Sequence, residues 1–122
     1  MSDPSIIKTN AEIGRWYLER VSSIPELNKK WIGQHLSARE RAEAAWRIRH
    51  KARTEARSMS DEREVELLRA RDLAEYGNAD GPAFEFLVEQ LAEAGLEEEA
   101  VYEAIIDGSY KTNAEVNRRL GL

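Results

Sequence analysis

The stretch Ser37–Met59, SARERAEAAWRIRHKARTEARSM, decides the fold class of this chain. Ser37 and Glu40 have the spacing of a capping box, in which each side chain bonds the other residue's backbone amide at a helix start. Apolar residues then recur at steps of three and four, which is the period of an amphipathic α-helix. They are Ala38, Ala42, Ala45, Ile48, Ala52, Ala56 and Met59. The stretch therefore predicts a long helix that packs closely on its neighbours through an alanine stripe.

The helical period blurs just after this stretch, around Ser58–Glu62. Ser60 or Asp61 can cap a new helix that carries Val65, Leu68 and Leu73, with Leu67 alongside. Either one long helix runs to Tyr76 or two helices meet near Ser60. The capping residues favour a break or kink.

Towards the N-terminus, a second capping box at Thr9–Glu12 predicts a helix that runs to about Val21. Pro25 is a good first helical residue, so a short helix to about Ile32 should follow and end at Gly33.

Towards the C-terminus, Tyr76–Pro82 is the clearest loop, with Gly77 placed to end the preceding helix. Phe84, Leu87, Val88 and Leu91 then mark a helix that stops at Gly95, and Leu96–Ala100 opens another that closes at Gly108. Thr112–Glu115 is a third capping box, which predicts a short last helix with Val116 and Leu120.

No segment has strand periodicity or a hairpin signal, so the prediction is an all-α single domain of five to six helices. It divides into an N-terminal helical hairpin (1–36), a central long or kinked helix (37–76) and a C-terminal group of three short helices (77–122).

Composition excludes several classes of site. The chain of 122 residues has no cysteine, which excludes disulfides and thiolate zinc sites, and its two histidines cannot form a three-histidine metal site. No P-loop, dinucleotide fingerprint or nucleophile elbow is present, so we expect no cofactor, no metal and no recognisable catalytic motif.

No apolar run approaches the roughly 20 residues that span a bilayer. The start lacks a signal peptide, so we expect synthesis in the cytosol, with signal-independent export left open.

Opposite the alanine stripe, the long helix carries a row of cationic and aromatic side chains: Arg39, Glu43, Trp46, His50, Arg53 and Arg57, with Arg49 alongside. We call Trp46, Arg49, His50, Arg53 and Arg57 the basic row and take them as candidate binding residues. Forked guanidinium donors suit phosphates and carboxylates, an indole can stack on a base, and His50 is the one candidate for catalytic proton transfer.

The charge distribution gives the basic row an alternative partner. Residues 37–58 carry seven basic and three acidic groups, whereas residues 59–122 carry six basic and sixteen acidic groups. The row can therefore pair with the chain's own acids instead of an external anion. A net charge of −5 also disfavours binding to nucleic acid, whose affinity depends on neutralised phosphates.

The segments Ser37–Glu43, Ile48–Arg57 and Tyr76–Pro82, followed by Val101–Ile106 and Thr112–Asn117, resemble the small helical C-terminal modules of bacterial polymorphic toxin proteins of the rearrangement-hotspot (Rhs) type. The resemblance covers residues 36–122 and carries no catalytic signature. It implies an effector module delivered by a specialised secretion system, with a protein partner that is a target, an immunity protein or a carrier.

Two functional hypotheses follow. In the first, the chain is an effector module that engages an anionic target or a partner protein through the basic row. In the second, it is a non-catalytic adaptor, possibly homodimeric, that uses its tryptophans and the alanine-faced helix. Trp16, Trp31 and Trp46 either anchor the first helices on the long one or lie exposed as interface anchors.

Overall fold

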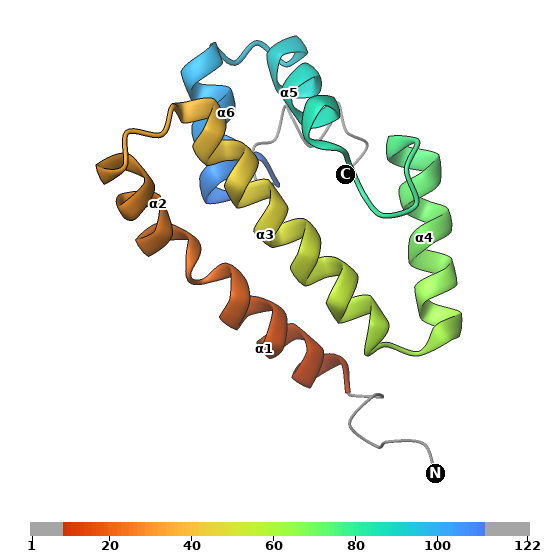
Figure 1. The fold of residues 1–122 in the computed structure, drawn as a ribbon. Helices are drawn as coiled ribbons and strands as arrows, with labels where there is room; N and C mark the ends of the chain where they lie inside the picture. The colour runs from red at the N-terminus through yellow and green to blue at the C-terminus, as the bar shows by residue number, and fades with distance from the viewer. Residues whose placement is uncertain (1–8, 112–122) are drawn as a thin grey trace.

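A computed structural model of the chain describes residues 9–111, and these fold into helices joined by short loops (Figure 1). In chain order the elements are α1 (Asn10–Val21), α2 (Ile24–Gly33), α3 (Ala38–Ser58), α4 (Glu62–Tyr76), α5 (Phe84–Glu93), α6 (Glu98–Asp107) and a 3-10 helix, η1 (Ser109–Lys111). No strand occurs within these residues, so the all-α prediction is confirmed.

Both capping boxes that lie within the described residues are formed. The Thr9 hydroxyl accepts the Glu12 amide at 3.2 Å, and the Ser37 hydroxyl accepts the Glu40 amide at 3.1 Å. The Glu40 carboxylate in turn accepts the Ser37 amide at 2.9 Å. These bonds satisfy amides that a helix start would otherwise leave without a partner. The third box, at Thr112–Glu115, lies outside the described residues.

The break between α3 and α4 is a short turn. α3 ends at Ser58, and Asp61 caps α4 by accepting the amides of Arg63 and Glu64. α4 ends at Gly77, whose φ of 70° is the left-handed conformation that glycine adopts without a Cβ clash. The sequence prediction of two helices with a cap at Ser60 or Asp61 is therefore confirmed.

α3 is the central element of the fold. α3 packs most closely on α6, α1 and α2, and α5 packs on α6. Ala42, Ala45 and Ala52 of the alanine stripe are buried, which allows these neighbours to approach closely. Figure 1 shows α1 and α2 along one side of α3, with α6 against it and α5 above.

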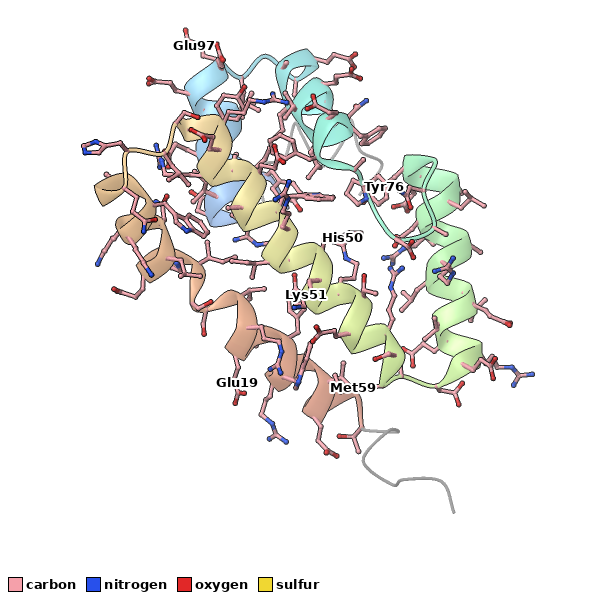
Figure 2. The ribbon with its side chains drawn as sticks, in the orientation of Figure 1. Glu19, His50, Lys51, Met59, Tyr76 and Glu97 are labelled. Carbon is pink, nitrogen blue, oxygen red and sulfur yellow. The ribbon has the colours of Figure 1, made fainter. Side chains whose placement is uncertain are left out.

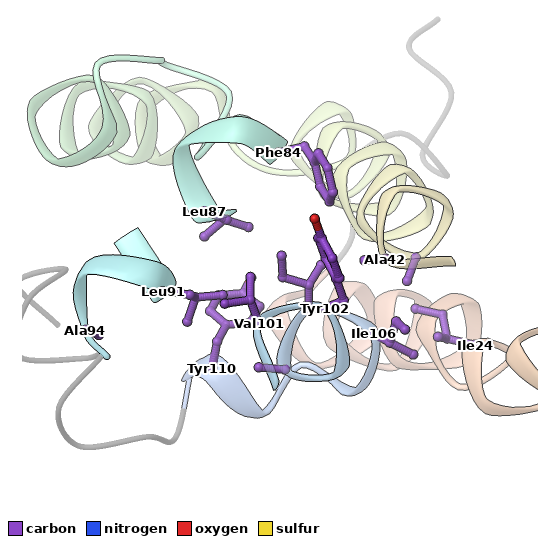
Figure 3. Close-up of a cluster of buried hydrophobic side chains, with 13 residues drawn as sticks. Ile24, Ala42, Phe84, Leu87, Leu91, Ala94, Val101, Tyr102, Ile106 and Tyr110 are labelled. Atoms are coloured by element: carbon purple, nitrogen blue, oxygen red, sulfur yellow. The ribbon is translucent and has the colours of Figure 1, made fainter. Parts of the chain in front are cut away.

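The hydrophobic core lies between α2, α3, α5 and α6 (Figure 3). Ile24, Leu87, Leu91 and Ile105 are its largest side chains that are fully buried. Tyr110 of η1 also belongs to this core, although no sequence pattern indicated it.

The three tryptophans are half-buried. This lies between the two alternatives that the sequence left open, which were anchors packed on the long helix and exposed interface anchors. Trp31 and Trp46 pack against the core, and Trp16 carries the guanidinium of Arg20 over its ring at 3.5 Å.

α4 is different from the other helices. It is absent from the closely packed helix pairs, and Figure 1 shows it standing to one side of α3. Its only buried residue is a charged one, Asp72. No described helix is long and apolar enough to cross a membrane.

Candidate functional site

Trp46 joins α3 to the start of α5. Its indole Nε1 donates a hydrogen bond to the Pro82 carbonyl at 3.1 Å, and its ring meets the Phe84 ring edge-on at 6.3 Å. Four residues along the helix, the His50 ring stacks on Trp46 with a centroid distance of 4.8 Å and an interplanar angle of 14°. Figure 2 shows His50 on the side of α3 that faces α4.

Arg49 reaches across to the end of α6. Its guanidinium donates to the Ile106 carbonyl at 2.9 Å and to the Ile105 carbonyl. These are last-turn carbonyls that the helix itself leaves without partners, and a cation there also interacts favourably with the helix dipole. Burial lowers the pKa of Arg49, and Tyr110 opposes part of that effect. The Arg49 side chain also packs closely against Gly108, because a Cβ added at Gly108 would lie 3.1 Å from Arg49 Nη2.

Arg53 packs on the loop between α4 and α5. Its guanidinium lies against Gly81, which is buried and has a φ of 98°. It also hydrogen-bonds the hydroxyl of Tyr110. Burial raises the pKa of Tyr110, and the charge of Arg53 opposes that shift.

Arg57 holds α4 to α3. It forms an ion pair with Asp72 and donates to the Ala79 carbonyl at 2.8 Å. Asp72 is 3% exposed and is the one charged residue that is buried in the described part of the chain. A buried carboxylate requires such a partner, because leaving water costs it far more than an apolar group.

Arg39, which begins the cationic face of α3, also has partners within the chain. It pairs with Glu85 and donates to the Tyr102 hydroxyl at 3.4 Å, and this bond raises the pKa of Arg39. The cationic face of α3 is therefore a seam that joins α3 to α4, α5 and α6. The arginines of this face bond backbone carbonyl oxygens more often than carboxylates, whereas the charge distribution had suggested carboxylates as their partners.

A cavity of about 10 Å³ lies within this seam. It is lined by Trp46, Arg49, His50, Arg53, Pro82, Leu87, Ile105 and Tyr110. Such a volume holds one water molecule and no larger ligand. His50 Nδ1 is buried and has no hydrogen-bond partner in the described residues, so no described group orients the ring through this nitrogen. The role of His50 in proton transfer stays a prediction.

No group of three or more His, Asp or Glu side chains that could hold a metal ion occurs among residues 9–111. The structure thus gathers four members of the basic row, Trp46, Arg49, His50 and Arg53, around one small cavity and places Arg57 apart, against α4.

The feature that sequence reasoning missed is the outer face of α4, which we define as Leu67, Ala70, Leu73 and Ala74. All four are exposed, and Leu67 and Leu73 are 69% and 57% exposed. Val65, Leu68, Asp72 and Tyr76 form the opposite, half-buried or buried side of the helix. A signal was present: aliphatic residues occur all round α4, which is typical of a helix that is covered on more than one side.

Two other large aliphatic residues, Leu18 and Ile32, are 62% and 53% exposed. Each is single, on a helix whose other side packs on α3. Isolated apolar residues are ordinary on protein surfaces, whereas a contiguous apolar face is characteristic of a contact site.

Comparison of the chain with protein-family models, with curated proteins and with solved structures finds no match. The resemblance to polymorphic toxin modules stays a prediction.

Proposed function

We propose that this chain is a helical interaction module that binds a protein partner through the outer face of α4. The observation that carries the proposal is a 15-residue helix whose large aliphatic side chains are nowhere fully buried by the described chain. A helix of this length is marginal in water without tertiary packing. A partner that covers Leu67 and Leu73 would supply the missing apolar contact.

Charge favours a protein over a nucleic acid as this partner. α4 carries five acidic and three basic residues, and the chain is acidic overall. Phosphates would be repelled at this surface. Arg39 and the arginines of the basic row, which would otherwise suit phosphates, already bond the chain's own carbonyls, Asp72, Glu85 and Tyr110.

Site-specific photo-crosslinking in living cells tests the proposal. A photoreactive amino acid replaces Ala70 on the outer face of α4, and a matched variant carries it at Ala92, an exposed alanine on α5. We expect a covalent protein adduct from position 70 and none from position 92. No adduct at 70, or the same adducts at both positions, would contradict the proposal.

A second candidate is the effector module of a polymorphic toxin system, acting through the basic row on an anionic target. One observation favours it: His50 stacks on Trp46 and lines one cavity with Arg49 and Arg53, and its Nδ1 has no hydrogen-bond partner among residues 9–111. In this proposal the chain is made in the cytosol, exported by a specialised system and neutralised by an immunity protein.

Induced expression in a bacterial cytosol tests this second candidate. We expect growth to stop, and to recover in the variants His50→Ala and Arg53→Ala. Unimpaired growth with soluble wild-type protein would rule out the effector class. Growth arrest that persists in both variants would rule out only the basic row as its cause.

A further inference from the structure

We propose that the occupant of the outer face of α4 is the same face of a second copy of this chain, packed antiparallel about a twofold axis beside Ala70. This inference rests on the proposed function and names its partner. An interface about a twofold axis uses one patch twice, so the patch must be complementary to itself.

The spacing of the exposed residues meets this requirement. Leu67 and Leu73 each stand three residues from Ala70, one before it and one after it. When two α4 helices cross antiparallel at Ala70, Leu67 of each copy lies at the level of Leu73 of the other. The two large side chains on each helix therefore meet two large side chains on the other.

The small side chains suit the centre of such a contact. Ala70 would face its own symmetry mate, and Ala74 widens the flat region beside it. Methyl side chains at a helix crossing allow the two axes to approach to about 8 Å, at the close end of helix packing. Leucines on both sides of that point would then cover the alanines from water.

One charge at the helix ends is also complementary, although Glu62 and Glu64 share the first turn of α4 with it. Arg63 stands seven residues before Ala70 and Gly77 seven residues after it, so Arg63 of one copy comes level with the C-terminal end of α4 in the other. That end has last-turn carbonyls and no basic residue of its own. A cation there is favourable, and antiparallel helix dipoles add to the attraction.

These features favour a second copy over an unrelated partner, which would require no symmetry in the spacing. The face is small for an interface, so the dimer should be weak, with a dissociation constant on the order of 10 µM. Association of this strength makes the oligomeric state of the chain depend on the protein concentration.

Sedimentation equilibrium of the purified full chain over a range of concentrations tests the inference. We expect a monomer–dimer equilibrium, weakened at least tenfold by Leu67→Lys with Leu73→Lys. The matched control, Leu18→Lys with Ile32→Lys, introduces the same charge at similarly exposed leucine and isoleucine positions on α1 and α2 and should leave the equilibrium unchanged.

Introduced cysteines test the antiparallel register, because the natural chain has none. Glu66 and Ala74 lie four residues either side of Ala70. On mixing Glu66→Cys with Ala74→Cys, we expect the mixed disulfide between positions 66 and 74. Self-pairing of 66 with 66 and of 74 with 74 would show a parallel arrangement and overturn the register.

A chain that stays monomeric up to about 1 mM would overturn the second-copy inference. So would a control variant that weakens association as much as the α4 variant does. If the photo-crosslink from position 70 has a mass other than that of two copies, the interaction surface stands and the second copy is wrong. If position 70 gives no crosslink at all, the proposed function itself fails.

Discussion

Arg57 and Asp72 form the pair of residues on which the placement of α4 depends most. The Asp72 side chain is 4% exposed and that of Arg57 is 13% exposed. Arg71 also approaches the Asp72 carboxylate, but only to 4.0 Å and from a side chain that is 61% exposed. Loss of Arg57 would therefore leave the buried carboxylate poorly compensated. The same guanidinium also bonds the Ala79 carbonyl, so it ties both α4 and the following loop to α3.

Replacing Arg57 by alanine is therefore predicted to lower the free energy of unfolding by about 3 kcal/mol, measured by denaturant titration. Arg47→Ala is the matched control. It removes an arginine of the same helix whose side chain is 71% exposed and paired with Glu43, and it should cost no more than about 0.5 kcal/mol. Adding Asp72→Asn to Arg57→Ala should recover about 1 kcal/mol, since the poorly compensated buried charge is gone. Equal effects of Arg57→Ala and Arg47→Ala would contradict the assignment.

Tyr110 gives the chain an alkaline pH dependence. Burial raises its pKa above the ordinary 10.0, so the folded state favours the neutral phenol more than the unfolded state does. Its contribution to stability is fully present below pH 10 and is lost as the pH rises through the folded-state pKa. Tyr76, whose pKa burial also raises, acts in the same direction.

Ultraviolet titration of tyrosinate measures this shift against the denatured chain. We expect part of the tyrosine absorbance change to occur at higher pH in the folded chain, and Tyr110→Phe to remove one such delayed ionisation. A folded Tyr110→Phe variant with the wild-type titration curve would show that Tyr110 is not the residue responsible.

Among the helices, the ends of each element were the most predictable feature. The capping boxes at Thr9 and Ser37, the cap at Asp61 and the C-terminal Gly77 depend on neighbours in sequence, so local patterns reveal them. The alanine stripe likewise indicated which side of α3 is buried.

The partners of the basic row were not predictable in the same way. Arg49 lies 56 and 57 residues before the carbonyls that it bonds, and Trp46 lies 36 residues before Pro82. Backbone carbonyls have no signature in a sequence, whereas acids do, so the pattern pointed to the sixteen acids instead. Similarly, Tyr110 enters the core through η1, a single 3-10 turn with no periodicity to indicate it.

The capping box of α3 makes a prediction at the level of the element. Ser37→Ala should lower the free energy of unfolding by about 1 kcal/mol in denaturant titration, because the Glu40 amide loses its acceptor. Ser22→Ala is the control, since the Ser22 hydroxyl bonds the Glu19 carbonyl at the end of α1 and caps no helix start. A loss no greater than that of the control would contradict the role of the box.

The same box has an acidic pH dependence. The Ser37 amide, and then its hydroxyl, hydrogen-bond the Glu40 carboxylate and hold its pKa below the ordinary 4.5. This stabilisation is present above pH 4.5 and is lost as the pH falls through the folded-state pKa. Glu40→Gln should therefore reduce the acid sensitivity of unfolding, and an unchanged acid limb would contradict the assignment.

In the whole molecule, the described chain divides between a packed part and a lightly held helix. α3 connects α1, α2, α5 and α6 around one core, whereas α4 is held mainly by Arg57, the Arg69–Asp80 ion pair and the contact of Tyr76 with Phe86. A helix with so little apolar packing should open more readily than the others. Its outer face should then gain protection when a second copy covers it.

Amide hydrogen exchange measured as a function of protein concentration shows whether α4 is lightly held and is covered by a second copy. We predict that the α4 amides exchange fast in dilute solution and slow at least tenfold as the concentration rises through the dimer range, while the amides of α3 and α6 remain unchanged. Protection of α4 that equals that of α3 and does not vary with concentration would contradict the account.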